Sequence, residues 1–271
     1  MFKLSFFINI FKILNILNTL GQNLKSVLFL FSLILAPYSS ANFQTEVNIG
    51  VALQKLKESN DINIYGLTLE HFDKILLIKG PLAETAYLNK SSSWYLAGID
   101  LEKTDTTIGI LGRTQFINKN TYIELELNTN FKKSDSLQEL SLNMGYYLDD
   151  YLRVSASTSF SKGNGWNEFI LFCARKLFPL TNNQNIAFEY ATAIEDEDFL
   201  EYQSATLTYY PVDFALLSLG ISHNTKERKG TYIDFSTQYY FTTQFEISAS
   251  FGYTNYDGVG DFWALSTSYR F

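Results

Sequence analysis

Histidine and cysteine, the residues that most often serve as catalytic bases, nucleophiles or zinc ligands, are scarce in this sequence. Among its 271 residues only His71, His223 and Cys173 belong to these types. A hydrolytic centre needs a nucleophile within hydrogen-bonding reach of a base, whereas Ser222 and His223, as neighbours in an extended segment, point to opposite faces. We therefore predict that the protein is not an enzyme and holds no metal and no cofactor, with a hydrolase as the least favoured alternative.

Charged residues that stand singly inside uncharged, alternating segments form the second group with chemical potential. Side chains of this kind can line a passage and set its ion selectivity, or they can pair and fill a closed interior. Acidic residues are the more numerous, which predicts a mild preference for cations. The candidate pore-lining residues are Arg113, Glu124, Glu126, Glu139, Arg153, Arg175, Glu189, Asp234 and Glu246.

The composition excludes several classes of protein. Hydrophobic residues make up 46% of the chain and charged residues 18%, which rules out a disordered chain and allows a large core. The formal net charge of -7 argues against a nucleic-acid partner, because binding to phosphates requires a dense basic face. The single cysteine excludes an intramolecular disulfide.

The first 41 residues are typical of an export signal that is removed from the mature protein. They contain no acidic residue, and they include an apolar run from Val27 to Ala36 that is too short for a transmembrane anchor. A cleavage site of small residues ends at Ala41, which leaves 42–271 as the mature chain. The residues before about Leu24 exceed what such a signal needs.

The mature chain repeats a two-residue alternation of apolar and polar side chains, which is typical of β-strands with one oily and one wet face. We count about 14 such segments, within a range of about 12 to 16, each near the roughly 9 to 11 residues of a tilted membrane strand. Two of them are Tyr95 to Leu101 and Ile108 to Phe116, where every second residue, starting from the first, is expected to face outward. Short turns alternate with longer polar loops, as in a barrel with an even number of strands.

A soluble β-sandwich is the alternative fold, because alternation alone requires only that one face be buried. Three features favour a membrane barrel. The wet positions are mostly Ser, Asn and Gly, aromatic residues gather at strand ends, and the chain stops inside a strand at Phe271. In lipid an open sheet edge leaves backbone groups unpaired, so the last strand must close on the first. We therefore predict an all-β fold, a single antiparallel transmembrane β-barrel over residues 42–271.

A membrane barrel with these charges must have a wet interior. An arginine on the lipid face near the midplane would cost about 2 to 4 kcal/mol, so the candidate residues should face water or one another. About 14 strands leave room for water, since about eight already suffice for side chains to fill the interior. The expected function is a porin-like channel for passive diffusion of small hydrophilic solutes or ions. A non-conducting adhesin or structural barrel is the alternative.

Two stretches resemble known bacterial proteins. The segment from Trp263 to Phe271 alternates and ends on Phe271 two residues after Tyr269, and it resembles the C-terminal assembly signal of Gram-negative outer-membrane proteins. Residues 80–88, Gly-Pro-Leu-Ala-Glu-Thr-Ala-Tyr-Leu, resemble a stretch near the N-terminus of a family of general bacterial porins.

The resemblance implies a bacterial outer-membrane location and contact with lipid and lipopolysaccharide. It also implies insertion by the barrel assembly machinery, with Tyr269 and Phe271 as the assembly signal. The polar loops are short, and none of them is an obvious candidate for a long loop that folds inward and constricts the pore. A homo-oligomer is compatible with the sequence.

Overall fold

The structure, a computed structural model, describes most of the chain after the predicted export signal. The described residues are 42–57, 61–102, 106–131, 138–161, 165–166, 169–181, 183–195, 198–225, 230–256 and 259–271. The signal, residues 1–41, lies outside them, so its cleavage after Ala41 stays a prediction. In the described part no helix is long and apolar enough to cross a membrane.

Fifteen strands form one sheet, and one of them, β8, has only two residues. The other fourteen form the barrel, which confirms the predicted all-β antiparallel fold and its strand number. A 3-10 turn, η1 (Leu82–Glu84), and a short helix, α3 (Thr85–Asn89), separate β2 from β3. The strands are β1 (Asn42–Leu56), β2 (Ile62–Leu77), β3 (Ser93–Leu101), β4 (Thr106–Phe116), β5 (Thr121–Asn130), β6 (Gln138–Tyr147), β7 (Leu152–Ser161), β8 (Gly165–Trp166), β9 (Phe169–Pro179), β10 (Asn185–Glu195), β11 (Asp198–Val212), β12 (Ala215–Asn224), β13 (Gly230–Tyr240), β14 (Phe245–Thr254) and β15 (Val259–Arg270).

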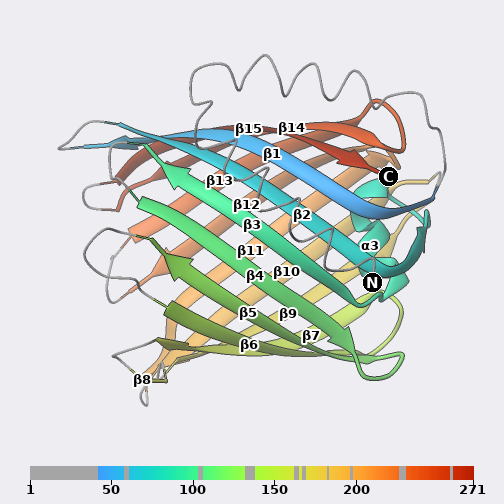
Figure 1. Cartoon of the computed structure of the whole chain (residues 1–271), viewed down its shortest axis with the longest axis horizontal. Coiled ribbons are helices and arrows are strands. Elements are labelled where there is room, and N and C mark those ends of the chain that lie inside the picture. The colour runs from blue at the N-terminus through green and yellow to red at the C-terminus, as the bar shows by residue number, and fades with distance from the viewer. Residues whose placement is uncertain are drawn as a thin grey trace, which may run out of the picture. The chain divides into compact units, whose positions relative to one another are not determined.

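The sheet closes on itself (Figure 1). β1 pairs with β2 on one side and with β15 on the other, and β6 pairs with β7 to complete the ring. At the seam Glu46 lies opposite Arg270, and the backbone N–H of Thr45 donates to the carbonyl of Phe271 over 2.8 Å. The return bond, from Phe271 N–H to the Thr45 carbonyl, measures 2.9 Å. The expected pairing of the last strand with the first is confirmed.

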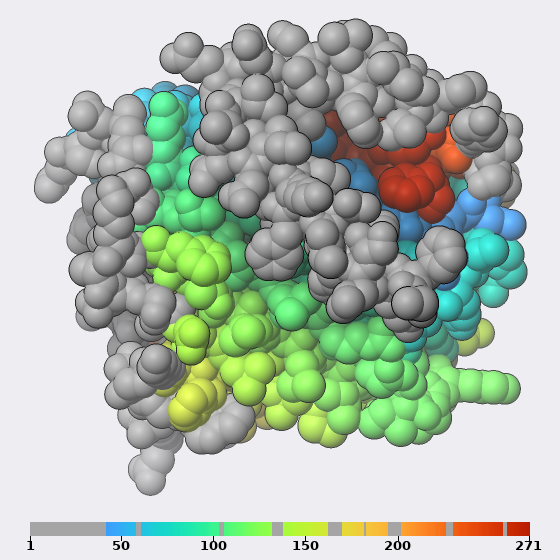
Figure 2. Space-filling model, viewed as in Figure 1, coloured from blue at the N-terminus to red at the C-terminus, as the bar shows by residue number. Residues whose placement is uncertain are grey.

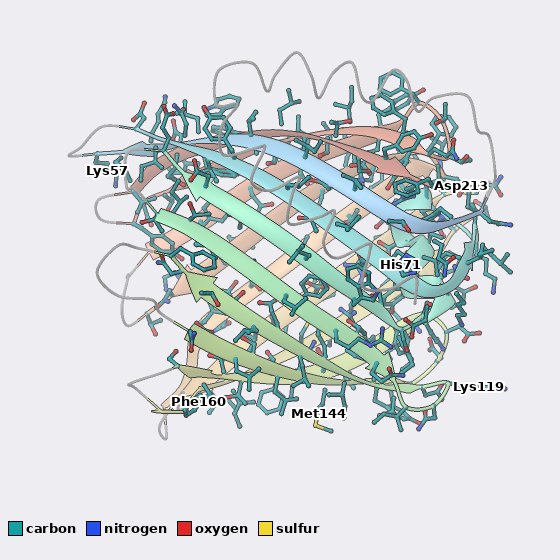
Figure 3. The ribbon with its side chains drawn as sticks, viewed as in Figure 1. Lys57, His71, Lys119, Met144, Phe160 and Asp213 are labelled. Carbon is teal, nitrogen blue, oxygen red and sulfur yellow. The ribbon has the colours of Figure 1, made fainter. Side chains whose placement is uncertain are left out.

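The two ends of the barrel differ in their connections. Short turns follow β4, β6, β9, β11 and β13 at one end, where β15 also finishes, and we call this the turn end. Apart from the one between β2 and β3, the other strand-to-strand connections lie at the opposite end, the loop end, and they include a longer one of seven residues between β5 and β6. In Figure 3 the labelled turn residues Lys119 and Asp213 mark the turn end, and Lys57 marks the loop end.

The turn between β6 and β7 is stabilised by its own aspartate. The Asp149 carboxylate accepts hydrogen bonds from the backbone N–H groups of Tyr151, over 2.6 Å, and Leu152, over 2.7 Å. Its other oxygen lies 2.6 Å from the Lys176 ammonium. The ammonium and the two N–H groups hold the pKa of Asp149 below its usual value. Asp149 and Asp150 were expected to form a tight turn, and this side chain is the physical reason.

The outer face of the barrel is apolar. Large hydrophobic side chains remain exposed along the strands, among them Leu125 at 46%, Leu219 at 54% and Met144 at 50%. Met144 points away from the barrel in Figure 3, and in Figure 2 the green strands form the lower part of the wall that faces the viewer. A soluble sheet would bury residues of this kind, whereas lipid tails accept them.

In β3 and β4 the structure reverses the predicted faces. Tyr95 pairs directly with Gly112, which pairs with Glu126, and directly paired residues share one face of a sheet. Glu126 faces the lumen, so Tyr95 does too, and Ile108 shares this face through its place in β4. The expectation that the sets starting from Tyr95 and Ile108 face outward is therefore wrong. Both alternating sets of β3 contain apolar residues, so hydrophobicity alone could not choose the face.

We predict that Gly112→Ala destabilises the barrel, because the added Cβ would overlap the ring of Tyr95 on the inner face. Overpacking of this kind lowers the free energy of unfolding by about 1–3 kcal/mol. The matched control is Gly66→Ala, since a Cβ at Gly66 would have no neighbour within 4 Å. Urea unfolding of the barrel folded in lipid vesicles measures both variants, and equal stability of the two would contradict the inward placement of Tyr95.

Candidate functional site

The lumen carries most of the residues that the sequence suggested for a pore. Most of them alternate with an exposed apolar residue of the outer face; Glu124 and Glu126, for example, flank Leu125, and Glu189 follows Phe188, which is 43% exposed. Their role in a pore stays a prediction. The residues on the inner face are Glu124, Glu126, Glu139, Arg153, Arg175, Glu189, Asp234 and Glu246.

Arg113 is the exception, because it lies on the outer face. It pairs directly with Trp94 on β3 and with the exposed Leu125 on β5. Its guanidinium bonds both oxygens of Asp73, Nη1 to Oδ1 over 2.8 Å and Nη2 to Oδ2 over 2.6 Å. The position is close to the end of β4 at Phe116, where a paired arginine can reach the membrane interface. The prediction that Arg113 lines the pore is wrong.

Two carboxylates on β5 are held together by a tyrosine that the sequence did not single out. The hydroxyl of Tyr95 donates to Glu126 and lies 3.3 Å from Oε1 of Glu124. Amide groups complete the arrangement, since Asn143 donates to Glu124 over 3.1 Å and Asn128 donates to Glu126 over 2.9 Å. In the described part of the chain neither carboxylate forms an ion pair with a lysine or arginine side chain.

Another wall of the lumen, formed by β1 and by β13 to β15, is mostly uncharged. It contains a recess of about 360 Å³. Hydroxyl and amide groups dominate this recess beside the single carboxylate of Glu246, so it can exchange hydrogen bonds with water or a polar solute. The polar residues on it include Asn48, Ser236, Gln238, Ser248, Ser250 and Ser266.

Residues 80–90, between β2 and β3, fold into the turn end of the barrel, and we call them the inserted segment (Figure 1). Gly80 starts the segment with a φ of 62°, a left-handed conformation that favours glycine, and Lys90 ends α3 with a φ of 47°. Pro81 and Thr85 are fully buried. The sequence showed no obvious candidate for a long loop that folds inward. In the structure the segment that enters the lumen comes from the turn end, and the stretch from Gly80 to Leu88 forms it.

One part of the inserted segment is anchored through its backbone. The N–H of Leu82 donates to the carbonyl of Asp213 over 2.7 Å, and its carbonyl accepts a hydrogen bond from Arg270 Nη1 over 3.1 Å. Arg270 also bonds Glu46 over 2.7 Å, so it joins the insert to the seam between β1 and β15. Apolar packing adds to the anchor: Ala83 and Leu88 lie against a buried cluster of Leu177, Ala187 and Tyr210.

The other part is held by side chains. The carboxylate of Glu84, which is 3% exposed, accepts hydrogen bonds from Tyr210 and Arg175. The hydroxyl of Tyr87 donates to the backbone carbonyl of Tyr151 over 2.9 Å. These partners belong to β9, β11 and the β6–β7 turn, whereas the anchor uses β15, so the inserted segment lies across the turn end of the lumen.

Arg175 also pairs with a residue of the lumen wall, Glu189, over 3.2 Å. Its guanidinium therefore bridges Glu84 on the insert and Glu189 on β10. Glu246 was predicted to line the pore, but it is only 3% exposed and accepts a hydrogen bond from Ser268 over 2.9 Å, so it belongs to the packed turn end. Most of the charged side chains at this end therefore form contacts that hold the wall and the insert together.

The residues considered for catalysis or assembly lie elsewhere. Both histidines occupy the outer face, His71 with Nδ1 2.9 Å from the Thr45 hydroxyl and His223 with Nδ1 3.1 Å from the Thr231 hydroxyl. Among the described residues no group of three or more His, Cys, Asp or Glu could hold a metal ion. Tyr269 and Phe271 stack at the end of β15 with ring centroids 6.2 Å apart, and their role as an assembly signal stays a prediction.

Comparison with known proteins bears on the fold. No protein-family model matches the chain, and no curated protein matches it. The crystal structure of Omp33, an outer membrane protein of Acinetobacter baumannii, is similar over 86% of this chain and 100% of that chain, with a TM-score of 0.70 and 16% sequence identity. The chain has the fold of an outer-membrane β-barrel.

A mutant of the Rh. blastica porin is more distant: it covers 84% of this chain and 100% of its own, with a TM-score of 0.47 and 7% identity. At such identities the likeness concerns the fold alone. The predicted resemblance to outer-membrane barrels is confirmed at the level of the fold, and this fold points to the bacterial outer membrane.

We predict that single cysteines report the two faces as the structure assigns them. The background is Cys173→Ala, which removes the one native cysteine. A fluorophore on Leu125→Cys or Arg113→Cys should be quenched by brominated lipid in reconstituted vesicles, because both positions face outward. A fluorophore on Glu126→Cys should be shielded from the lipid quencher. Efficient quenching at Glu126, or none at Arg113, would contradict the assignment.

Proposed function

We propose that this barrel is an outer-membrane channel for passive diffusion of small hydrophilic solutes or ions, with a mild preference for cations. One observation carries the proposal: carboxylates without cationic partners, Glu124 and Glu126 above all, line the interior of a barrel whose exterior is apolar. Charged groups at this depth are stable only next to water or to each other. Fourteen strands enclose more space than the roughly eight whose interior is filled by side chains.

In this proposal the turn end faces the periplasm, as short turns do in outer-membrane barrels, and the loop end faces outward. The inserted segment then covers the periplasmic mouth. Its side-chain contacts converge on Glu84, whereas its backbone anchor at Leu82 is separate. Conduction therefore requires the part around Glu84 and Tyr87 to move while the anchor holds. Lipid and lipopolysaccharide would surround the outer face. Tyr269 and Phe271 would form the signal that the barrel assembly machinery recognises.

A non-conducting structural barrel is the second candidate, and the buried insert is the observation that favours it. Pro81, Thr85 and Glu84 are all shielded from solvent, as in a permanent part of the fold. The two candidates differ in one measurable property, the current that the purified barrel passes through a membrane.

We predict that Glu84→Gln increases conduction. The substitution removes one charge of a buried pair with Arg175, and breaking such pairs costs about 3–5 kcal/mol, which is enough to shift a closed state toward an open one by on the order of tenfold or more. Single-channel recording in planar bilayers measures the open probability of the wild-type and variant barrels.

The control for this experiment is Glu102→Gln, which removes the same charge next to Asn63, away from the insert. Silence of both the wild-type and the Glu84→Gln barrels, with the β-structure intact, would overturn the channel proposal. A wild-type barrel that already conducts fully and is unchanged by Glu84→Gln would leave the channel standing and remove the closing role of the insert.

We predict that the Tyr95-bridged carboxylates set the ion preference. In the conducting Glu84→Gln background, the further change of Glu124 and Glu126 to glutamine should reduce the cation-over-anion permeability ratio about two- to fivefold, because the lumen loses two negative charges. Reversal potentials in a salt gradient measure the ratio. Glu102→Gln again serves as the control, and a channel that prefers anions before these changes would contradict the proposed selectivity.

A further inference from the structure

We propose that Arg153 and Tyr122 form a binding site for a small monovalent anion, such as chloride, beside the inserted segment. The site is separate from the carboxylates that the proposed channel uses. Its existence does not depend on whether the barrel conducts.

The first step is the unpaired charge of Arg153, on the inner face of β7. In the described part of the chain its guanidinium meets aromatic rings instead of a carboxylate: the centroid of Tyr87 is 5.5 Å away and that of Tyr122 is 5.9 Å away. Tyr147 and Cys173 approach the same guanidinium and are neutral. None of these four groups cancels a positive charge; the Glu189 carboxylate also acts on Arg153, but its ion pair is with Arg175.

The carboxylates on this side of the lumen are engaged by a different arginine. Arg153 lies directly opposite Arg175 in the register of β7 and β9, and two like charges in directly opposite positions repel. Arg175 is compensated twice, by Glu84 on the insert and by Glu189 on β10. Arg153 is the member of the pair that is left without a counter-charge in contact.

The second step is an unsatisfied donor next to this charge. Tyr122 is 3% exposed, and its hydroxyl has no hydrogen-bond partner among the described residues. Buried hydroxyl groups are nearly always bonded, so an orphaned one calls for a partner. An anion that lies between this hydroxyl and the Arg153 guanidinium would accept hydrogen bonds from both, and it would also balance the charge.

The surroundings limit the size of the anion. The ring of Tyr147 lies 5.3 Å from that of Tyr87 and 6.2 Å from that of Tyr122, so aromatic faces crowd the guanidinium. Tyr122 itself lies over Gly145, where a Cβ would overlap its ring. A halide-sized ion matches this aromatic enclosure better than a phosphate ester or an organic acid. Tyr87 belongs to the insert, so the bound ion would be a neighbour of the inserted segment.

The test uses the full-length barrel in detergent and chloride as the probe. The NMR line width of chloride is measured at constant ionic strength, with gluconate replacing chloride, because the line broadens when the ion exchanges with a protein site. The wild-type barrel should broaden the line, and excess bromide should reverse the broadening by competition. Arg153→Gln should abolish the broadening.

Two further variants make the result decisive. Tyr122→Phe keeps the ring and its packing and should weaken chloride affinity about tenfold, the size of a lost hydrogen bond to a charged group. Arg113→Gln, which removes an arginine of the outer face, should leave the broadening unchanged. Broadening by Arg153→Gln equal to that of the wild type, unchanged affinity in Tyr122→Phe, or a wild-type barrel without broadening would each overturn the proposal.

Discussion

Every strand of this barrel has a hydrogen-bonded neighbour on both sides, and the rest of the structure depends on that closure. In lipid no water is present to satisfy a free sheet edge, so the seam between β1 and β15 is as necessary as any other strand pair. Closure also separates two environments. One set of alternating side chains meets lipid, and the other, which includes Glu124, Glu126 and Asp234, meets the interior.

The turn end is held together by different interactions from the strands. Strand positions follow from backbone pairing, whereas the inserted segment is held by single side chains, each with a specific partner. Arg175 and Tyr210 converge on Glu84, and Arg270 meets both Glu46 and the Leu82 carbonyl. Such contacts are strong when complete and costly when one partner is missing, because the survivor is left buried with its charge. The insert is therefore sensitive to single changes at these side chains.

The fold was largely predictable from the sequence, because the two-residue alternation repeats over the whole mature chain and few folds can place such strands in a membrane. The faces of β3 and β4 were not predictable from hydrophobicity. Tyr95 and Leu96 are both apolar enough for lipid, and only the pairing of Gly112 with Glu126 decides between them. A glycine opposite a large aromatic residue, as in Gly112 with Tyr95 and Gly145 with Tyr122, was a usable signal for an inward-facing ring.

The site was predictable only in part, for reasons of distance along the chain. The parity of single strands correctly placed seven of the nine charged candidates on the inner face, and Arg175 was placed there because an arginine in lipid is costly. The parity failed for Arg113, whose counter-charge, Asp73, lies 40 residues earlier. The contacts of the insert were harder still to predict. Glu84 is bonded by Arg175 and Tyr210, which lie 91 and 126 residues further along the chain, and no local sequence pattern indicates such contacts.

The hydrogen bond from Arg270 to Leu82 spans 188 residues of sequence. During synthesis the inserted segment is therefore made long before β15, and its contact with Arg270 can form only after β15 has been made. Closure of the barrel and completion of the contacts of the inserted segment thus both depend on the last strand. A barrel in which β15 has not yet paired with β1 therefore lacks both the closed sheet and the contact between Arg270 and the inserted segment.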